Sequence, residues 1–434
     1  MSFRLTEHRR WLIVALLFCL SVINYLDRQT LSVLAPTLRG EMGFTTVEYS
    51  YIVTSFMVAY TIGYLFCGRA LDRIGVKIGI ALAIGFWSLA GMLHAAAAGW
   101  FGLAVCRFLL GLGESFNAPG GAKAIGEWIP RRERGLSMAI FSNGNIWGAI
   151  IAPPMVSFAA LTFGWQWGFL TTGAVGLLWL AVWLWFYDSP EKHRAISPDE
   201  RAYILQERGA EEAPAQSSML QLLKHPSCCG MFFARLLTDP LPFFFTFWMP
   251  EYLSNNRGFT LALIGALGWI PFLAADVGGP GGGALSDWLV RRGWQPQAAR
   301  LRVMLGAALM MPLSALAVRT GSAGLSLAII ALLLASHSCW IVNLLTASSE
   351  AFPRSQVGAV VALSSMGGSI GGIISNLLTG QVIAAYGYVP VFTALALLHP
   401  AAYVILNLAL RNNRLGRRED SVSDAVKRPV EEAA

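Results

Sequence analysis

Long apolar stretches recur along nearly the whole chain and are separated by short polar connections. A helix needs about 20 consecutive, mainly apolar residues to cross the hydrocarbon core of a bilayer. Only 13% of the 434 residues are charged, whereas soluble globular proteins usually carry about 25%. The sequence therefore predicts an all-α membrane protein with twelve transmembrane helices, six on each side of the polar interruption at 188–225. The expected spans are 11–36, 50–70, 78–98, 100–122, 136–161, 167–187, 230–253, 262–286, 301–319, 325–348, 358–383 and 388–410.

The distribution of basic residues indicates which ends of the spans face the cytoplasm. An even number of spans places both termini on one side, and all but six of the 32 Lys and Arg residues are expected there. Such an excess marks the cytoplasmic side, so we expect a multi-pass protein of the cytoplasmic (inner) membrane with both termini cytoplasmic. The net charge of +7 then reflects topology, and no nucleic-acid partner is expected. The six exceptions are Arg39, Arg257 and Arg319 on the opposite side, and Arg28, Arg107 and Arg235 within spans.

One short pattern follows both the second and the eighth expected span, as "GRALDRIGVK" (68–77) and "GALSDWLVRR" (283–292). Each copy has a glycine, an aspartate four residues later and a cation five residues after that. A glycine lets two helices approach closely, and the charges can tie a tight cytoplasmic turn to a neighbouring helix. We interpret the two copies as matching conformational loops in the two halves of the chain. Their residues are Gly68, Asp72, Arg73, Lys77, Gly283, Asp287 and Arg292.

The first and fourth spans carry charged residues to membrane depth. The apolar run before Asp27 and Arg28 is too short to span a bilayer, so both residues must lie inside the helix. Arg107 and Glu114 are seven residues apart, about two helical turns, and share one face. Buried charges normally face a water-filled cavity or one another. Arginines that can clamp a carboxylate, beside acids that can carry protons, suit a negatively charged substrate moved with protons.

These residues and motifs resemble the major facilitator superfamily of secondary transporters over residues 11–410. Within it, the chain is similar to the anion:cation symporter branch and to bacterial hexuronate (glucuronate/galacturonate) transporters. The resemblance implies a six-helix bundle at 1–187, a cytoplasmic inter-bundle loop at 188–229, a second six-helix bundle at 230–410 and a cytoplasmic tail at 411–434. It also implies alternating access and proton-coupled import of a sugar acid. The stretches that carry it are "INYLDR", "YSYIVTSFMVAYTIGYLFCGRALDRIG", "CRFLLGLGESFNAPGGAKAIGEWIP", "SPEKHRAIS", "RLLTDPLPFFFTFWMPEYL" and "ADVGGPGGGALSD".

The resemblance also implies roles for single residues of the first half. Two acids match the proton-coupled carboxylates of the family, and two arginines match its substrate-binding and acid-partner arginines. A tyrosine matches its cavity tyrosine, and an asparagine lies where related members carry another amide. In that order the residues are Asp27 and Glu114, Arg28 and Arg107, Tyr60, and Asn145.

Each of these residues also has a purely structural interpretation. Arg107 and Glu114 could form only a structural salt bridge, and Asp27 could cap the helix or pair locally. Tyr60 and Asn145 could be polar groups that pack between helices. From the residues alone, both sets of interpretations stay open.

The second half carries less charge within its spans. Arg235 and Asp239, four residues apart, are expected to pair with each other near the cytoplasmic end. In "HSCWIVNLLT", His337 and Asn343 resemble a His and an Asn of the hexuronate members, so they are candidate hydroxyl-binding residues or packing residues. Trp248 could offer a ring face to a sugar or form part of a helix interface.

The sequence favours a transporter over an enzyme. It has no Walker motif and no metal or Cys–His cluster, and the G-x-S-x-G string around Ser369 lies in an apolar span without the strand a nucleophile elbow needs. We therefore expect no catalytic residue, cofactor or metal, and a monomer whose partners are a sugar acid, protons and the lipid bilayer. The alternatives are a symporter of another organic anion (an aldonate, tartrate or an aromatic acid) and a sensor that does not transport, for which no signalling domain is evident.

Overall fold

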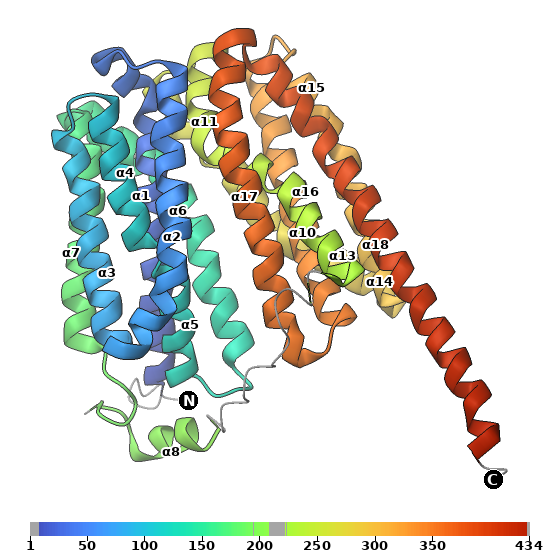
Figure 1. Ribbon diagram of the computed structural model, residues 1–434. Coiled ribbons are helices and arrows are strands. Elements are labelled where there is room, and N and C mark those ends of the chain that lie inside the picture. Colours follow the sequence, from blue (N-terminus) through green and yellow to red (C-terminus); the bar gives the residue numbers. More distant parts are fainter. Residues whose placement is uncertain (1–7, 194, 208–221, 223, 432–434) are drawn as a thin grey trace. The chain divides into compact units, whose positions relative to one another are not determined.

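The computed structural model describes residues 8–193, 195–207, 222 and 224–431, and every regular element among them is helical (Figure 1). This confirms the predicted all-α class. The first helices are α1 (Arg9–Met42), α2 (Thr46–Ile74), α3 (Val76–Leu93), α4 (Trp100–Glu114), α5 (Asn117–Trp128), α6 (Arg134–Phe163), α7 (Trp165–Phe186) and α8 (Pro198–Glu207). The later ones are α10 (Pro226–Thr238), α11 (Pro240–Arg257), α12 (Leu261–Leu267), α13 (Ile270–Arg291), α14 (Pro296–Met310), α15 (Ser314–Ala317), α16 (Ala323–Ala351), α17 (Arg354–Tyr386) and α18 (Tyr388–Glu431).

Eleven stretches of the described chain are long and apolar enough to cross a membrane. The expected span at 100–122 is not among them because a turn divides it into α4 and α5. At this turn the N–H of Phe116 donates to the carbonyl oxygen of Gly113 at 3.3 Å, a tighter pattern than that of an α-helix. The turn follows Glu114 directly. Large apolar side chains such as Leu65 (71% exposed) and Phe158 (68% exposed) cover the outer surfaces of the helices, as contact with lipid requires.

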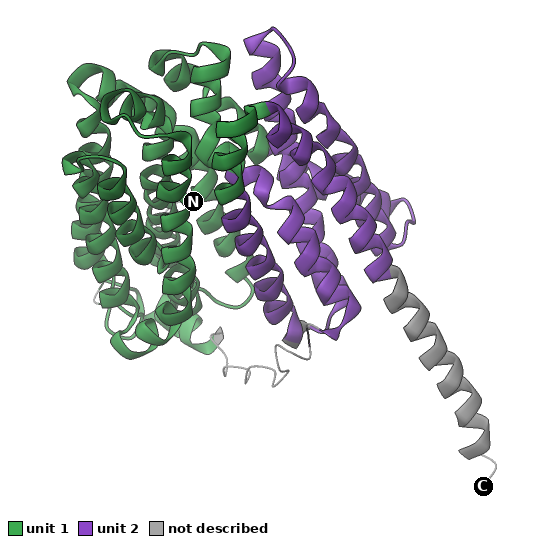
Figure 2. Ribbon diagram, turned by 45° about the horizontal axis from the view of Figure 1, so that its top comes forward, with its two compact units in different colours: residues 1–212, 244–276, 376–388 green, residues 213–243, 277–375, 389–434 purple. Residues whose placement is uncertain are grey.

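Two compact units make up the chain (Figure 2). Unit 1 comprises 1–212, 244–276 and 376–388, and unit 2 comprises 213–243, 277–375 and 389–434. Unit 1 thus contains the N-terminal helices together with parts of α11, α13 and α17 and all of α12. The expected division into two sequential bundles, with boundaries near 187 and 230, stays a prediction.

Glycines bring the helices of unit 1 into backbone contact. A Cβ atom at Gly144 of α6 would overlap the carbonyl oxygen of Phe18 on α1, and one at Gly148 would overlap that of Val22. Gly111 of α4 lies in the same way against the carbonyl oxygen of Phe56 on α2. Close approach through small residues is the usual means of helix association in membranes. It fixes α1 and α4, the two helices that carry the charged residues.

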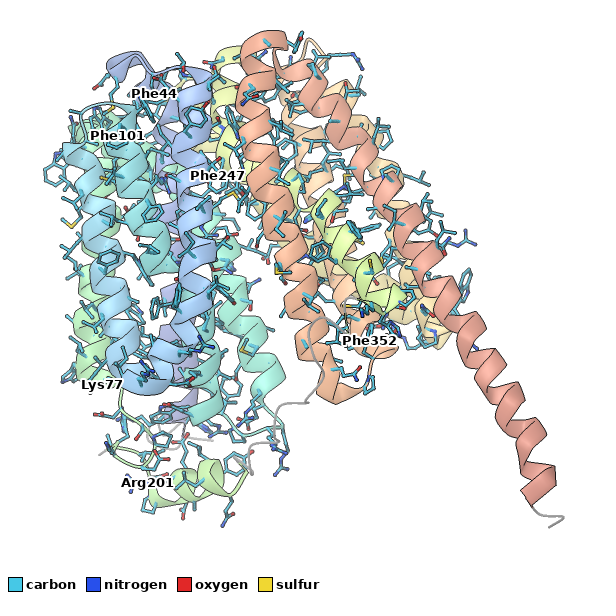
Figure 3. The ribbon with its side chains drawn as sticks, in the orientation of Figure 1. Phe44, Lys77, Phe101, Arg201, Phe247 and Phe352 are labelled. Carbon is cyan, nitrogen blue, oxygen red and sulfur yellow. The ribbon has the colours of Figure 1, made fainter. Side chains whose placement is uncertain are left out.

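Part of the expected inter-bundle loop is ordered against unit 1. Arg10 at the start of α1 pairs with Glu133 at 2.8 Å and with Glu200 of α8 at 3.0 Å. Arg201, labelled in Figure 3, donates to the carbonyl oxygen of His193 at 2.7 Å. Burial lowers the pKa of His193, whose Nε2 lies 3.1 Å from the carbonyl oxygen of Phe186. The segment around α8 therefore caps the polar end of α1.

In unit 2 a core of buried side chains joins α10, α14, α16 and α18. Trp340 of α16 is fully buried there with Met304 of α14 and Ala402 of α18. Phe352, labelled in Figure 3, lies at the end of this core, with its ring centre 5.0 Å from that of His225.

Candidate functional site

The four charged residues expected within the first and fourth spans are all buried inside unit 1. The exposed fractions are 3% for Asp27, 8% for Arg28, 1% for Arg107 and 0% for Glu114. Asp27 and Arg28 lie near the middle of α1, and Arg107 and Glu114 lie on α4. Because such charges are costly at this depth, each must be compensated by a partner, a proton or a ligand.

Glu114 pairs with Arg28, and the ion pair between Arg107 and Glu114 considered from the sequence is not formed. Nε and Nη2 of Arg28 donate to Oε2 of Glu114 at 3.2 and 2.9 Å. Arg107 instead donates from Nη2 to the carbonyl oxygen of Arg28 at 3.1 Å. The shared face of α4 brings Arg107 and Glu114 towards α1 together, but the arginine on α1 takes the carboxylate. Sequence spacing along one helix gives no information about such a competitor.

Three buried polar atoms of Arg107 and Glu114 remain without partners among the described residues. Nε and Nη1 of Arg107 make no hydrogen bond, and neither does Oε1 of Glu114. The two nitrogens lie on different edges of the guanidinium, so each could donate a separate hydrogen bond to an anion. The cluster therefore has an unused anion-binding capacity.

Asp27 points away from Arg28. It lies beside Thr172 of α7 and Trp87 of α3, yet neither of its oxygens completes a hydrogen bond within the described chain. An ionised carboxylate without a partner is costly to bury, so a group in this position can serve to take up a proton. The local pairing considered from the sequence is absent from the described contacts.

Aromatic rings enclose the guanidinium of Arg28. Its Cζ lies 4.7 Å from the ring centre of Tyr25, 4.9 Å from that of Phe56 and 5.1 Å from that of Tyr60. Phe56 also lies under Arg107, at 5.8 Å. The structure thus brings Tyr60 to the charged cluster, and cation–π contact supports the positive charge of Arg28.

Asn145 of α6 has no hydrogen bond to this cluster among the described residues. Its Oδ1 is buried and has no partner there. Its neighbour Asn143 donates to Oδ1 of Asp276 at 2.6 Å. Asp276 lies on α13 and is a carboxylate within an apolar stretch that the sequence analysis did not single out. The feature of the sequence that could have pointed to Asp276 is its position in the middle of the eighth expected span.

A second group of polar contacts in unit 1 joins α1 and α2 to α11, and its central residue, Glu251, is not among the residues predicted from the sequence. Arg39 forms an ion pair with Glu251, which is 1% exposed. The hydroxyl of Tyr49 donates to the carbonyl oxygen of Phe247 at 2.6 Å (Phe247 is labelled in Figure 3). Glu251 lies inside the seventh expected span, so the second half carries more intramembrane charge than expected.

Trp248 belongs to the same interface. It is 0% exposed, its Nε1 donates to Oδ1 of Asn376 at 2.9 Å, and its ring meets that of Tyr49 edge-on with centres 5.0 Å apart. No ring face is open to a sugar in this conformation. The structure agrees with the helix-interface interpretation of Trp248.

In unit 2 the expected pairing of Arg235 with Asp239 is confirmed, at 2.7 Å between Nη2 and Oδ2. His337 is paired as well, because its Nδ1 lies 3.0 Å from Nε2 of His399 on α18. His399 is fully buried and was not predicted, although a histidine in the last apolar span was visible in the sequence. Asn343 is 0% exposed and donates to the carbonyl oxygen of Cys339 on its own helix at 2.9 Å. The ring of His337 thus has a protein partner, whereas Oδ1 of Asn343 is buried without a partner among the described residues.

The aspartates of the repeated loops each reach a cation on another helix. Asp72 pairs with Lys123 of α5, and Asp287 lies 2.6 Å from Nη1 of Arg300 on α14. Arg300 is shared with Glu350 at 3.2 Å. This arrangement matches the tie expected between each loop and a neighbouring helix.

The glycines and cations of the repeated loops have surroundings that differ from one residue to the next. A Cβ atom at Gly68 would meet nothing within 4 Å, so the expected close approach at this glycine is absent. Backbone geometry instead requires Gly75 and Gly293, whose φ angles are +79° and +91°. Lys77 pairs with Asp188 at 3.1 Å. The remaining motif residues are Arg73, which is exposed, Gly283, whose Cβ would meet Val342 at 3.4 Å, and Arg292, which lies 3.9 Å over the ring of Trp288.

Comparison with known proteins extends these observations. The family model described as Major Facilitator Superfamily matches residues 17–375. The chain is 31% identical over 411 residues to a hexuronate transporter of Escherichia coli (strain K12), with 93% of this chain and 94% of the relative covered. It is 35% identical over 272 residues to a galacturonate transporter of Dickeya chrysanthemi, with 62% and 79% covered. The fold is similar to that of a bacterial homolog of the human lysosomal transporter Spinster, solved in an inward-facing and unoccupied conformation. The TM-score is 0.72 at 16% identity, with 95% and 98% of the two chains covered.

Proposed function

Because the chain belongs to the major facilitator superfamily of membrane transporters, we propose that it imports a sugar acid together with protons by alternating access. The substrate class is a hexuronate such as glucuronate or galacturonate, as the names of its relatives suggest. The protein acts in the cytoplasmic membrane as a monomer, with both termini in the cytoplasm. The observation that carries this proposal is the buried guanidinium of Arg107, whose Nε and Nη1 have no partner in the described residues.

Arg107 supplies the anion-binding group. A buried guanidinium with two unused N–H groups costs free energy unless an anion satisfies it. The carboxylate of a uronate could accept a charge-assisted hydrogen bond from either of these nitrogens. The second arginine of the cluster, Arg28, lies close by, since its backbone carbonyl accepts a hydrogen bond from Arg107.

Competition for Arg28 couples substrate to protons. In the structure Arg28 is bound to Glu114. A substrate carboxylate that draws Arg28 towards itself leaves Glu114 without its partner and favours proton uptake there. Conversely, a proton on Glu114 releases Arg28 for the anion. This route differs from the sequence-based expectation, in which Arg107 was the partner of Glu114.

Asp27 carries a second proton. Import of an anion against an inside-negative potential costs about 2.3 kcal/mol per charge per 100 mV. One proton cancels the charge of the substrate, and a second makes import favourable with respect to voltage. Asp27, buried and without an ion-pair partner within the described chain, is the available second carboxylate.

The contacts between α1, α2 and α11 support alternating access. The ion pair of Arg39 and Glu251 and the bond from Tyr49 to Phe247 lie near the end of α1 and the beginning of α2, away from the termini. These contacts must separate if substrate enters from that end. The paired aspartates of the repeated loops, at the ends of α2 and α13, each tie a loop to a helix of the same half of the chain.

Transport by purified protein in proteoliposomes tests the proposal. With an imposed inward proton gradient, we expect accumulation of glucuronate or galacturonate. Other organic anions should inhibit this uptake only if they bind to the same site. Arg28→Lys and Arg107→Lys should each abolish uptake because lysine keeps the charge but loses the planar fork. The matched control is Arg319→Lys, at an exposed arginine. Full transport by both lysine variants, or uptake independent of the proton gradient, would contradict the proposal.

A further inference from the structure

A separate cavity of about 280 Å³ lies within unit 2. It is between the beginning of α14 and the part of α18 from Tyr403 to Leu410. It does not involve the charged cluster of α1 and α4. Its volume is small for an organic cofactor but sufficient for a polar headgroup. It is lined by Trp294, Gln297, Ala298, Leu301, Arg302, Leu305, Tyr403, Asn407 and Leu410.

The polar lining of this cavity suits an anion. Its side chains include a guanidinium, an indole N–H, two amides and a phenol, and no carboxylate. Arg302 is exposed and forms no ion pair within the described part of the chain. Its Cζ lies 5.6 Å from the ring centre of Trp294. Arg300, two residues earlier, is fully engaged with Asp287 and Glu350. Arg302 therefore has its charge available at the mouth of the cavity.

The start of α14 adds to this positive potential. The helix begins at Pro296 with no side-chain cap and no acidic residue in its first turn. Gln297 and Ala298, in that first turn, line the cavity. The positive end of the helix dipole is thus uncompensated beside Arg302.

The surroundings of the cavity indicate that the anion belongs to a lipid. Exposed apolar side chains continue from it along both helices: Leu309 (59%) and Met310 (38%) on α14, and Val404 (55%) and Leu408 (56%) on α18. On a membrane-spanning chain such faces contact acyl chains. Trp294, 40% exposed, is typical of the boundary between hydrocarbon and water. A phosphate held by Arg302 would therefore have its attached chains beside a matching surface.

We propose that this cavity binds the phosphate headgroup of an acidic phospholipid from the adjoining leaflet. Arg302 holds the phosphate, and Trp294, Tyr403 and Asn407 offer hydrogen-bond donors to its oxygens or to the glycerol of the headgroup. Basic pockets between transmembrane helices are suited to acidic headgroups of this kind. The proposal does not depend on the transported substrate.

The test uses the full chain purified in detergent and titrated with phosphatidylglycerol, phosphatidylcholine or inorganic phosphate. Lipid binding is followed by native mass spectrometry, and the thermal unfolding midpoint is measured in parallel. We expect phosphatidylglycerol to bind and to raise the midpoint. Arg302→Gln should weaken its binding about fivefold or more, corresponding to the roughly 1 kcal/mol that one basic residue contributes at an anionic membrane surface. Arg319→Gln, at an exposed arginine between α15 and α16, is the matched control and should bind as the unaltered chain does.

Three results would overturn the proposal. Equal binding of phosphatidylglycerol and phosphatidylcholine would show that the headgroup charge is not recognised. Unchanged binding by Arg302→Gln would place the lipid elsewhere. An equal rise of the midpoint with inorganic phosphate would make the cavity a site for free anions. If Arg302→Gln is unstable in detergent, Trp294→Phe, which removes the indole donor and keeps a smaller aromatic ring, provides the second variant and should show a smaller loss in the same direction.

Discussion

Glu114→Gln separates substrate binding from proton coupling. Glutamine has nearly the same shape and its amide oxygen can still accept from Arg28, which is bound to Glu114 at 2.9 Å in the structure. The buried ion pair is nevertheless replaced by a bond to a neutral acceptor, which should cost about 1–3 kcal/mol of folding free energy. That is less than the roughly 3–5 kcal/mol expected when one partner of a buried pair is simply removed.

The effect on transport follows from the lost protonation site. One pH unit of gradient supplies about 1.4 kcal/mol per coupled proton, which corresponds to about tenfold accumulation. With two coupled protons, and no membrane potential, the unaltered protein should reach about 100-fold accumulation per pH unit. Glu114→Gln should abolish this pH-driven accumulation, while Arg28 remains available to the anion, so exchange of external for internal substrate should continue.

Proteoliposomes loaded at fixed internal pH measure both quantities, as steady-state accumulation and as exchange of labelled substrate. Glu133→Gln is the control, because it removes the ion pair with Arg10 at the polar end of α1 and leaves the buried cluster intact. Undiminished accumulation in response to the pH gradient by Glu114→Gln would refute the coupling role. Loss of exchange in a correctly folded variant would show that Glu114 is needed for binding itself.

Three further outcomes are expected. Asp27→Asn should also abolish accumulation driven by a pH gradient, and at least one of the two carboxylate variants should retain exchange; if both still concentrate substrate, the protons use another route. Asp72→Asn and Asp287→Asn should each slow the transport cycle without a comparable loss of substrate affinity, because their partners tie loops at helix ends; an equally steep fall in affinity, measured by equilibrium binding, would contradict this. Glu251→Gln should weaken the contact with Arg39 and increase labelling of a cysteine introduced beside it by a membrane-impermeant thiol reagent; unchanged labelling would show that this ion pair does not restrain that end.

Much of this arrangement could be predicted from residue types and hydropathy. The membrane class follows from long apolar runs, and Asp27 and Glu114 were recognisable because a charge within such a run is costly. The pairing of Arg235 with Asp239 was predictable because residues four apart lie on the same side of a helix. Each of these inferences uses contacts within one helix or the cost of one residue in the membrane.

Contacts between helices could not be derived in this way. Arg28 takes the carboxylate of Glu114 from a helix 86 positions away in sequence, and His337 is occupied by His399, 62 positions away. The pairing of Glu251 with Arg39 could not be derived either, because Arg39 is at the end of a different span. The turn after Glu114 was also missed, since "GESFN" contains no proline and remains compatible with a continuous helix.

The glycine contact between α2 and α4 has a consequence for how substrate range can change. Gly111 lies against the backbone of Phe56, and the ring of Phe56 lies beside both Arg28 and Arg107. The main-chain contact therefore helps to hold the ring of Phe56 beside both guanidinium groups. Under the proposed function, this ring positions the two arginines for the charged end of the substrate. We expect changes of substrate range towards longer or differently hydroxylated acids to occur in the walls that face the uncharged end.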